Sequence, residues 1–142
     1  MLNAIFFYRI SRWLFLHHVP ILPKLITLFI FLTYNSKVPY QASIGKGTVL
    51  GYGGIGVVIH KKAVIGKNCM IGQNVTIGGG NSHYPGLPII GDNVHINHGA
   101  VVFGGINVGN GAVIGANAVG NKPVPENAVV AGVPAKILRI KE

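Results

Sequence analysis

Histidine supplies most of the groups in this sequence that can exchange a proton near neutral pH. The six are His17, His18, His60, His83, His95 and His98. Acidic residues are limited to Asp92, Glu126 and Glu142, and Cys69 is the only cysteine. A histidine that acts as a general base takes a proton from a reacting hydroxyl without a metal or a covalent nucleophile. No metal site is predicted, because the histidines are scattered and no second cysteine is present.

The elements that must position these histidines follow a six-residue period. Aliphatic residues recur in this register at Ile44, Leu50, Ile59, Ile65, Ile71, Ile77, Ile90, Ile96, Val102, Val108 and Ile114. Two intervals are longer, nine residues after Leu50 and thirteen after Ile77. An α-helix cannot keep one face on this period, whereas a short strand followed by a tight corner can. Glycine usually follows the aliphatic residue, where it gives the backbone freedom to turn.

Three such strand-and-corner units close one triangular coil, and stacked coils bury a ladder of Ile and Val. The pattern therefore predicts a mainly β fold, a parallel β-helix, over residues 37–133. Its hand does not follow from the spacing, and the general rule for crossover connections favours a right-handed path. Residues 1–36 are predicted as a helical segment and residues 134–142 as a short C-terminal tail.

The N-terminal segment is apolar but interrupted. Basic residues and prolines divide it at Arg9, Arg12, Pro20, Pro23 and Lys24. We expect two short amphipathic helices, because a spanning helix needs about 20 apolar residues. No basic n-region or small-residue cleavage site indicates a secretory signal. Two compatible interpretations remain. In the first, the helices cap the β-helix or form an oligomer contact. In the second, residues 1–33 make a peripheral contact with the inner face of the cell membrane.

Composition and charge limit the partners. Apolar residues make up 49% of the chain and the net charge is +9. The apolar share excludes a disordered polar chain, and the single cysteine fits a reducing compartment, so we expect a cytoplasmic protein. The positive charge suits nucleic acid, an anionic membrane surface or an anionic small ligand. No nucleic-acid motif accompanies it, so we expect no nucleic-acid partner.

Four stretches resemble the hexapeptide-repeat acyltransferases: they read IGKNCMIGQNVTIGG, IIGDNV, VIGANAV and AGVPAKI. The closest similarity is to serine O-acetyltransferases and to related O-acetyltransferases of bacterial polysaccharide pathways, over residues 37–140. The resemblance implies a left-handed parallel β-helix, against the crossover rule. It also implies a homotrimer with active sites between subunits and acetyl-CoA as the donor of an O-acetyltransferase reaction, with no metal.

The resemblance leaves the acceptor open. Serine acetyltransferases carry a long helical N-terminal domain, whereas only residues 1–36 precede the repeat here. This difference favours the shorter relatives that act on glycans, so we expect acetyl transfer to a hydroxyl of a saccharide or glycan intermediate. The alternatives are a serine O-acetyltransferase of cysteine biosynthesis and a non-catalytic β-helix that scaffolds partners.

The repeat register separates the histidines into surface residues and candidates. His17 and His18 lie outside the repeat, and His95 directly precedes Ile96 and therefore points outward. His60 occupies a corner where glycine is usual. It is a candidate base or ligand contact, and the alternative is a solvated corner residue. His98 follows Ile96 by two residues, and it lies either in the substrate pocket or in packing between subunits.

His83 and Tyr52 become candidates through the resemblance. His83 lies in the insertion 79–87, and related sugar and xenobiotic acetyltransferases keep a catalytic histidine in such a loop; the alternative is a mobile surface loop. Serine acetyltransferases keep another catalytic histidine after the coil that ends here at Leu50, and Tyr52 stands near that place. The aspartate that supports the histidine in those enzymes corresponds to a position near Lys37 in this sequence. Another carboxylate or a backbone carbonyl must therefore orient the base.

For the donor, the family binds the pantetheine arm of CoA along the C-terminal coils. The matching positions are Gly104, Gly105, Gly115, Ala116 and Asn117, where small residues let backbone groups approach the arm. Lys122, Lys136 and Arg139 are predicted to face the CoA phosphates, and a solvated basic tail is the alternative. Cys69 occupies a small-residue position of the repeat, so we expect its side chain to be buried and to serve only in packing.

Overall fold

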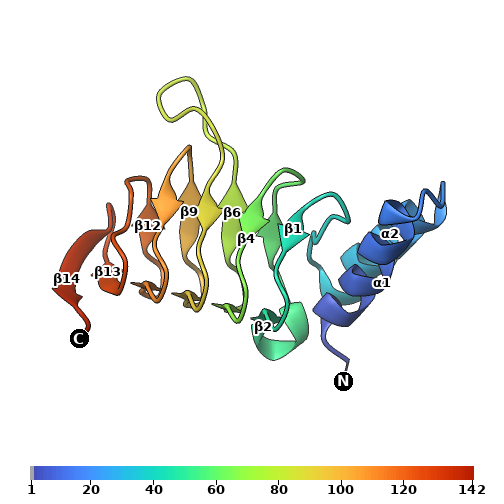
Figure 1. Cartoon of the computed structure of the whole chain (residues 1–142), viewed down its shortest axis with the longest axis horizontal. Coiled ribbons are helices and arrows are strands. Elements are labelled where there is room, and N and C mark those ends of the chain that lie inside the picture. The colour runs from blue at the N-terminus through green and yellow to red at the C-terminus, as the bar shows by residue number, and fades with distance from the viewer. Residues whose placement is uncertain (1) are drawn as a thin grey trace.

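The computed structural model describes residues 2–142; Met1, which belongs to the predicted helical segment, lies outside the described residues. Two helices, α1 (Ala4–Leu16) and α2 (Leu22–Tyr34), lead into a row of stacked short strands (Figure 1). The strands are β1 (Ser43–Ile44), β2 (Val49–Leu50), β3 (Val58–Ile59), β4 (Val64–Ile65), β5 (Met70–Ile71), β6 (Thr76–Gly78), β7 (Ile89–Ile90), β8 (His95–Ile96), β9 (Val101–Phe103), β10 (Asn107–Val108), β11 (Val113–Ile114), β12 (Val119–Gly120), β13 (Ala128–Ala131) and β14 (Lys136–Ile140). A 3-10 turn, η1 (Gly51–Gly54), separates β2 from β3.

Every third strand pairs in parallel with its counterpart in the next coil. The three sheets run β1-β4-β7-β10, β2-β5-β8-β11-β13 and β3-β6-β9-β12, which makes four complete coils. The coils form a left-handed parallel β-helix, as the family resemblance implies, so the right-handed path favoured by the crossover rule is wrong. That rule depends on twisted strands and a helix that packs back on the sheet, whereas these coils turn through tight corners between short strands. Residues 136–140, predicted as a tail, form β14 and pair antiparallel with β13.

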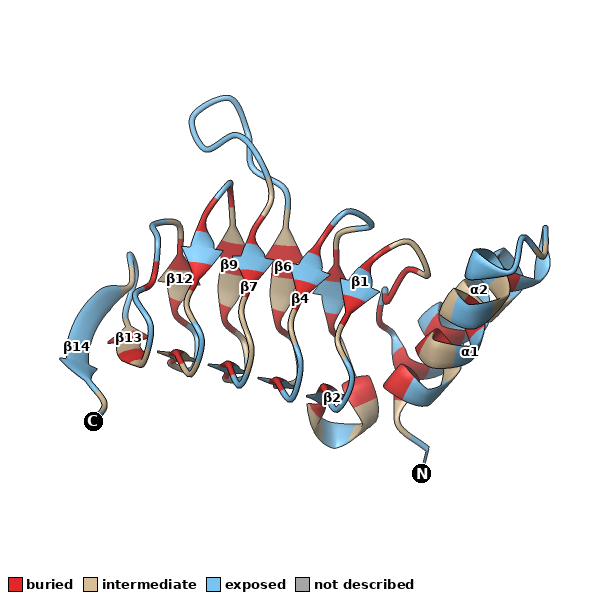
Figure 2. Ribbon diagram, in the orientation of Figure 1, coloured by how far each residue is buried: buried red, intermediate tan, exposed pale blue. Residues whose placement is uncertain are grey.

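The six-residue register decides which side chains are buried (Figure 2). In the two-residue strands the first side chain points outward and the second inward, as Met70 and Ile71 do in β5. Ile71, Ile77 and Ile114 are fully buried, and each such side chain contributes about 1.5–3 kcal/mol relative to exposure. The predicted ladder of aliphatic residues is confirmed.

Two of the three corners carry asparagine in the left-handed backbone region. Asn68, Asn74, Asn93, Asn117 and Asn127 all have φ between 55° and 59°. The Oδ1 of Asn68 lies 2.1 Å from the place where a β-carbon on Gly47 would be, and Gly47 itself has a φ of +82°. Glycine is needed there for its backbone conformation and because the asparagine of the next coil fills the space.

The helices form a hairpin that caps the first coil. The Tyr8 hydroxyl donates to the carbonyl of Ala42 and accepts the amide N–H of Ile44 at 3.2 Å. Burial raises the pKa of Tyr8, which keeps its hydroxyl protonated as a donor.

Two guanidinium groups add to this contact. Arg9 donates to the carbonyls of Ile44 and Gly45, and Arg12 donates to the carbonyls of Tyr40 and Gln41 at 3.2 and 3.1 Å. Burial lowers the pKa of Arg9. The inner face of the hairpin therefore acts as the predicted cap on the β-helix.

We expect Ile71→Ala to lower the free energy of unfolding by about 2–5 kcal/mol, because it opens a cavity in the centre of the ladder. Urea unfolding followed by circular dichroism measures the change. Val64→Ala is the matched control, since Val64 is 43% exposed on β4, and it should cost less than about 0.5 kcal/mol. Equal losses in the two variants would contradict the burial register.

Candidate active site

The corners of the β-helix place the candidate residues on two different edges. The Tyr52 edge joins the second and third strands of each coil and carries Tyr52, Gln73, His98 and Ala116–Asn117. The His60 edge joins the third strand to the next coil and carries residues 60–62, 79–88, 104–105 and 121–123. The structure therefore groups His60 with His83 and separates both from His98.

His60 lies half-buried at the end of β3, with its ring against the start of the loop. A β-carbon on Gly79 would lie 3.7 Å from the Nε2 of His60. On the other side of the ring, Nδ1 accepts the amide N–H of Lys62 at 3.1 Å. A neutral imidazole that accepts at Nδ1 carries its proton on Nε2. In this geometry His60 presents an N–H donor toward the loop, rather than a basic nitrogen.

The loop 79–88 is ordered by its own contacts and projects from the His60 edge (Figure 1). The Asn81 side chain accepts the amide N–H groups of His83 at 2.9 Å and Tyr84 at 3.0 Å. The amide N–H of Gly105 donates to the carbonyl of Pro85 at 2.8 Å, which ties the loop to the next coil. The His83 side chain is exposed within this loop and is available to a ligand on the same edge.

The loop takes up part of the surface that we predicted for CoA. A β-carbon on Gly104 would lie 3.2 Å from the Cβ of Tyr84, and one on Gly105 would lie 2.8 Å from the carbonyl oxygen of Pro85. The Tyr84 ring also packs edge-on against Phe103, with centroids 5.4 Å apart. The two glycines are therefore explained in part by close packing of the loop, a contact that the sequence did not indicate.

Tyr52 has an unusual backbone. Its φ of 48° and ψ of 44° fall in the left-handed region, which a bulky residue rarely adopts, and its side chain is 79% exposed. Such backbone strain is a reason to suspect a functional role. His98 lies on the same edge but two coils away, a backbone separation of about 10 Å at the spacing of adjacent strands. Tyr52 and His98 therefore do not contact each other through their backbones.

The acidic residues in the β-helix lie away from the histidine candidates. Asp92 and Glu126 occupy the third edge, between the first and second strands of the coils. Asp92 Oδ1 accepts the amide N–H of Lys67 at 2.8 Å, which is the role of a corner residue. Within one chain His60 is oriented by the amide of Lys62 and not by a carboxylate.

Cys69 is buried, as expected, and its thiol donates to the carbonyl of Gly91 at 3.1 Å. Burial raises the pKa of the Cys69 thiol, so the reactive thiolate is disfavoured. Within residues 2–142, no three His, Cys, Asp or Glu side chains are grouped to hold a metal ion.

A pocket of about 260 Å³ lies at the C-terminal end of the His60 edge. It is lined by Gly120, Lys122, Pro123, Val124, Val130, Ala135, Lys136 and Ile137. It brings together Lys122 and Lys136, two of the three cations predicted to meet the CoA phosphates. Arg139 lies on β14, where it pairs with Val129 of β13, and it does not line this pocket. Gly115, Ala116 and Asn117 lie on the Tyr52 edge of the fourth coil.

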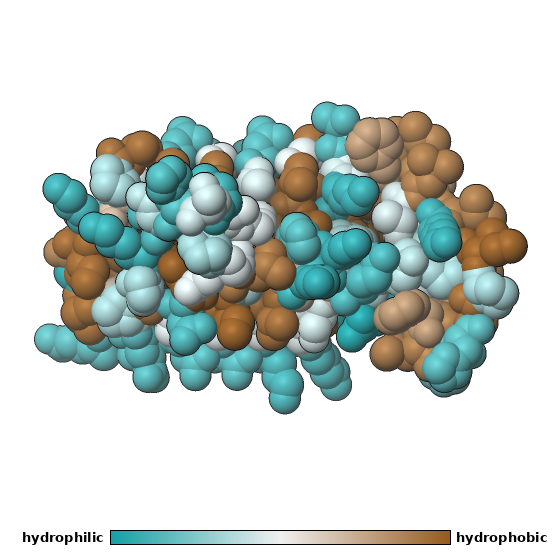
Figure 3. All heavy atoms as spheres, turned by 90° about the horizontal axis from the view of Figure 1, so that it is seen from above, coloured by the Kyte–Doolittle hydropathy of each residue, from teal (hydrophilic) through white to brown (hydrophobic). Residues whose placement is uncertain are grey.

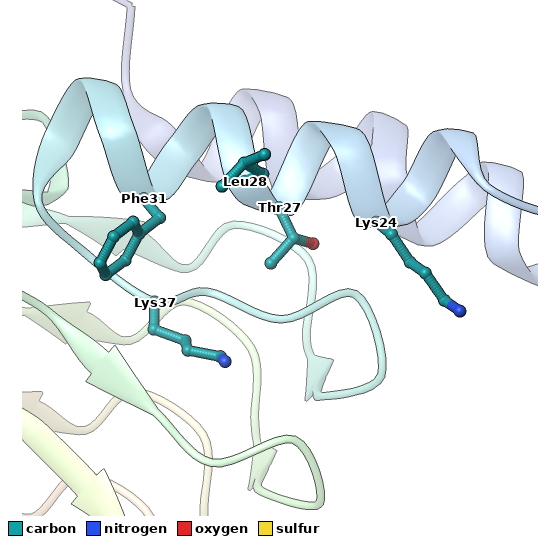
Figure 4. A pocket seen from close by; sticks show the side chains of 5 residues that line it. All are labelled: Lys24, Thr27, Leu28, Phe31 and Lys37. Carbon is teal, nitrogen blue, oxygen red and sulfur yellow. The ribbon is translucent and has the colours of Figure 1, made fainter.

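A second cavity, of about 330 Å³, lies between α2 and the start of the β-helix (Figure 4). Leu28, Phe31 and Thr27 line it together with Lys24 and Lys37. Lys37, which stands near the place of the aspartate in serine acetyltransferases, lies between α2 and β1 and forms a parallel β-bridge with Val58 of β3. This cavity combines an apolar wall with two ammonium groups, and no sequence motif had indicated it.

Comparison with known proteins identifies relatives of the same fold. The serine acetyltransferase of Synechococcus elongatus is 32% identical over 137 residues, and that of Escherichia coli strain K12 is 37% identical over 137 residues. The crystal structure of serine acetyltransferase from Brucella abortus strain S19 matches 97% of this chain and 56% of that chain, with a TM-score of 0.89 and 31% identity. Its complex with coenzyme A matches 98% of this chain and 56% of that chain, with a TM-score of 0.89 and 32% identity. No protein-family model matches the chain.

The stacked coils, with short strands repeating every six residues, define a hexapeptide-repeat β-helix protein. The chain belongs to the hexapeptide-repeat acyltransferase family. The matches cover 96% of this chain but only 56% and 50% of the Synechococcus and Escherichia relatives, so the chain spans about half the length of the curated relatives it matches.

We expect Asn81→Ala to loosen the loop, because it removes the acceptor of two amide N–H groups. Loss of about 1–1.5 kcal/mol of local stability corresponds to roughly tenfold faster hydrogen exchange at residues 80–86. Hydrogen exchange read by mass spectrometry measures this change. Ser82→Ala is the control, since no hydrogen bond of its side chain holds the loop, and protection that is the same in both variants would refute the anchor.

Proposed function

We propose that this chain is an acetyl-CoA-dependent O-acetyltransferase. The observation that carries the proposal is the match of 98% of the chain, at a TM-score of 0.89, to a serine acetyltransferase solved with coenzyme A. The pocket lined by Lys122 and Lys136 supports it, because two ammonium groups suit an anionic donor such as a CoA phosphate. Along the same edge lie the two histidines that can serve the transfer.

The chemistry divides between these histidines. The acceptor oxygen bonds to the carbonyl carbon of the thioester while a base takes the hydroxyl proton, and the C–S bond then breaks as the thiolate takes that proton back from the base. The Nε2–H of His60 is the proposed donor to the oxyanion that develops on the thioester carbonyl. Its proton stays on Nε2 because Nδ1 accepts the amide N–H of Lys62. His83 is the proposed base, since its exposed ring lies in the loop above the same edge.

For the acceptor we propose the hydroxyl of L-serine. The relatives are serine acetyltransferases, and one matching structure is a serine acetyltransferase complex with cysteine, at a TM-score of 0.86. The saccharide acceptor expected from the sequence finds no support among these relatives. A homotrimer and a cytoplasmic location remain part of the proposal.

We expect His60→Ala and His83→Ala each to lower kcat for serine acetylation by about 10²–10⁴-fold, because each removes a group that acts on the transferring proton or the oxyanion. Thiol release from acetyl-CoA measures the rate. His95→Ala is the matched control, since His95 points outward from β8 and should leave the rate unchanged.

The same assay tests the acceptor when L-serine and a sugar nucleotide are compared. Turnover of the sugar nucleotide alone would overturn the serine proposal and restore the saccharide prediction. If calorimetry detects no acetyl-CoA binding, the proposal that the chain is an enzyme is wrong, and the non-catalytic scaffold is the alternative that stands.

We expect Lys122→Ala and Lys136→Ala each to weaken CoA binding by roughly tenfold or more, because a hydrogen bond to a charged group contributes about 1.5–3 kcal/mol net of water. Binding of acetyl-pantetheine, which has no nucleotide phosphates, should not change. Calorimetry measures both ligands. Lys46→Ala, on a different edge, is the control, and an equal loss for acetyl-pantetheine would contradict a role toward the phosphates.

A further inference from the structure

The outer face of the α1–α2 hairpin is apolar and exposed. Residues 2–32 contribute 13 of the 25 large apolar side chains that are exposed in the described chain. They follow helical spacing, as Phe6, Ile10 and Trp13 do on α1 and Leu25, Phe29 and Leu32 do on α2. Figure 3 shows the apolar side chains gathered at the helical end of the molecule.

The chain itself does not cover this face. The hairpin buries a separate set of side chains, including Ala4, Tyr8 and Ile30, against the first coil and between its two helices. A soluble monomer rarely exposes a contiguous apolar patch larger than a few hundred Å² without a partner for it.

All the charged residues in and directly after the hairpin are basic. No Asp or Glu precedes Asp92, whereas Arg9, Arg12, Lys24 and Lys37 all lie in the first 37 residues. Arg9 and Arg12 donate inward to backbone carbonyls, so the free ammonium groups are those of Lys24 and Lys37. These two flank the apolar wall of Leu28 and Phe31 in the cavity beneath α2 (Figure 4).

We propose that the outer face of the hairpin binds the surface of an anionic lipid bilayer. An apolar helical face inserts into the boundary between headgroups and acyl chains, and cations beside it attract anionic headgroups. Neither helix of the described chain is long and apolar enough to cross a bilayer, so the hairpin lies along the surface. A second copy packed face to face would instead bring the same unneutralised cations together.

Trp13 makes the proposal directly measurable. It is the only tryptophan of the chain, it is 58% exposed on the proposed face, and its ring stacks on that of His17. Fluorescence excited selectively in tryptophan, and not in the five tyrosines, therefore reports this face alone. Insertion shifts the emission to shorter wavelength, and lipids with brominated acyl chains quench it only when the indole reaches the acyl region.

The experiment adds the full chain to vesicles of phosphatidylcholine alone, or of phosphatidylcholine with phosphatidylglycerol. We expect sedimentation with the anionic vesicles, quenching of Trp13 by brominated lipid, and weaker binding at high salt. Ile10→Glu and Leu25→Glu should each weaken binding by about 10-fold or more, since each removes a large apolar contact. Leu138→Glu is the matched control, since Leu138 is 67% exposed on β14 at the other end of the molecule.

Two outcomes would overturn the proposal. One is a chain that stays unbound and unquenched with anionic vesicles. The other is a Trp13 emission that shifts with protein concentration without lipid, together with an oligomer that Ile10→Glu dissociates, because a second copy then covers the face. The test does not depend on acetyl transfer, and serine acetylation by Ile10→Glu in lipid-free buffer reports that function separately.

Discussion

The stacking of similar coils in register is the constraint on which this structure depends. Each coil lies about 4.8 Å from the next, so every position has a counterpart directly above and below. A β-carbon on Gly66 would lie 2.4 Å from the carbonyl oxygen of Gly91, which leaves no room for a side chain at that corner. The inward positions take aliphatic residues for the same reason, because only a continuous ladder from Ile44 to Ile114 fills the interior.

A fold this regular places its chemistry where the repeat is broken. His60 replaces a corner glycine, the loop 79–88 lengthens the next corner on the same edge, and Lys122 follows two coils later. These departures leave the pairing of the strands intact, because they project outward from an edge. The other break, at Tyr52, lies at the opposite end of β3 and keeps a strained backbone. One coil therefore carries two unusual corners, and the His60 edge also carries the loop and the lysine-lined pocket.

The hairpin shows that one short segment can serve two surfaces. Tyr8, Arg9 and Arg12 turn their polar groups to backbone carbonyls of the first coil, which satisfies groups that a bare end of the β-helix would expose. The opposite side keeps Phe6, Trp13 and other large apolar side chains in solvent. Of the two interpretations drawn from the sequence, the structure supports the cap directly, and the uncovered outer face motivates the lipid proposal.

The sequence by itself determined which side chains face inward, because a six-residue period with glycine corners allows only one alternation, seen in exposed Met70 and buried Ile71. It also located the two helices and the outward direction of His95. It did not reveal that Nδ1 of His60 accepts from Lys62, that Asn81 and Gly105 hold the loop, or that residues 136–140 form a strand. Those features depend on corner conformations and on contacts between coils, which a one-dimensional period does not specify. Tertiary structure alone decided them, because closing three strands per coil sets which distant residues meet.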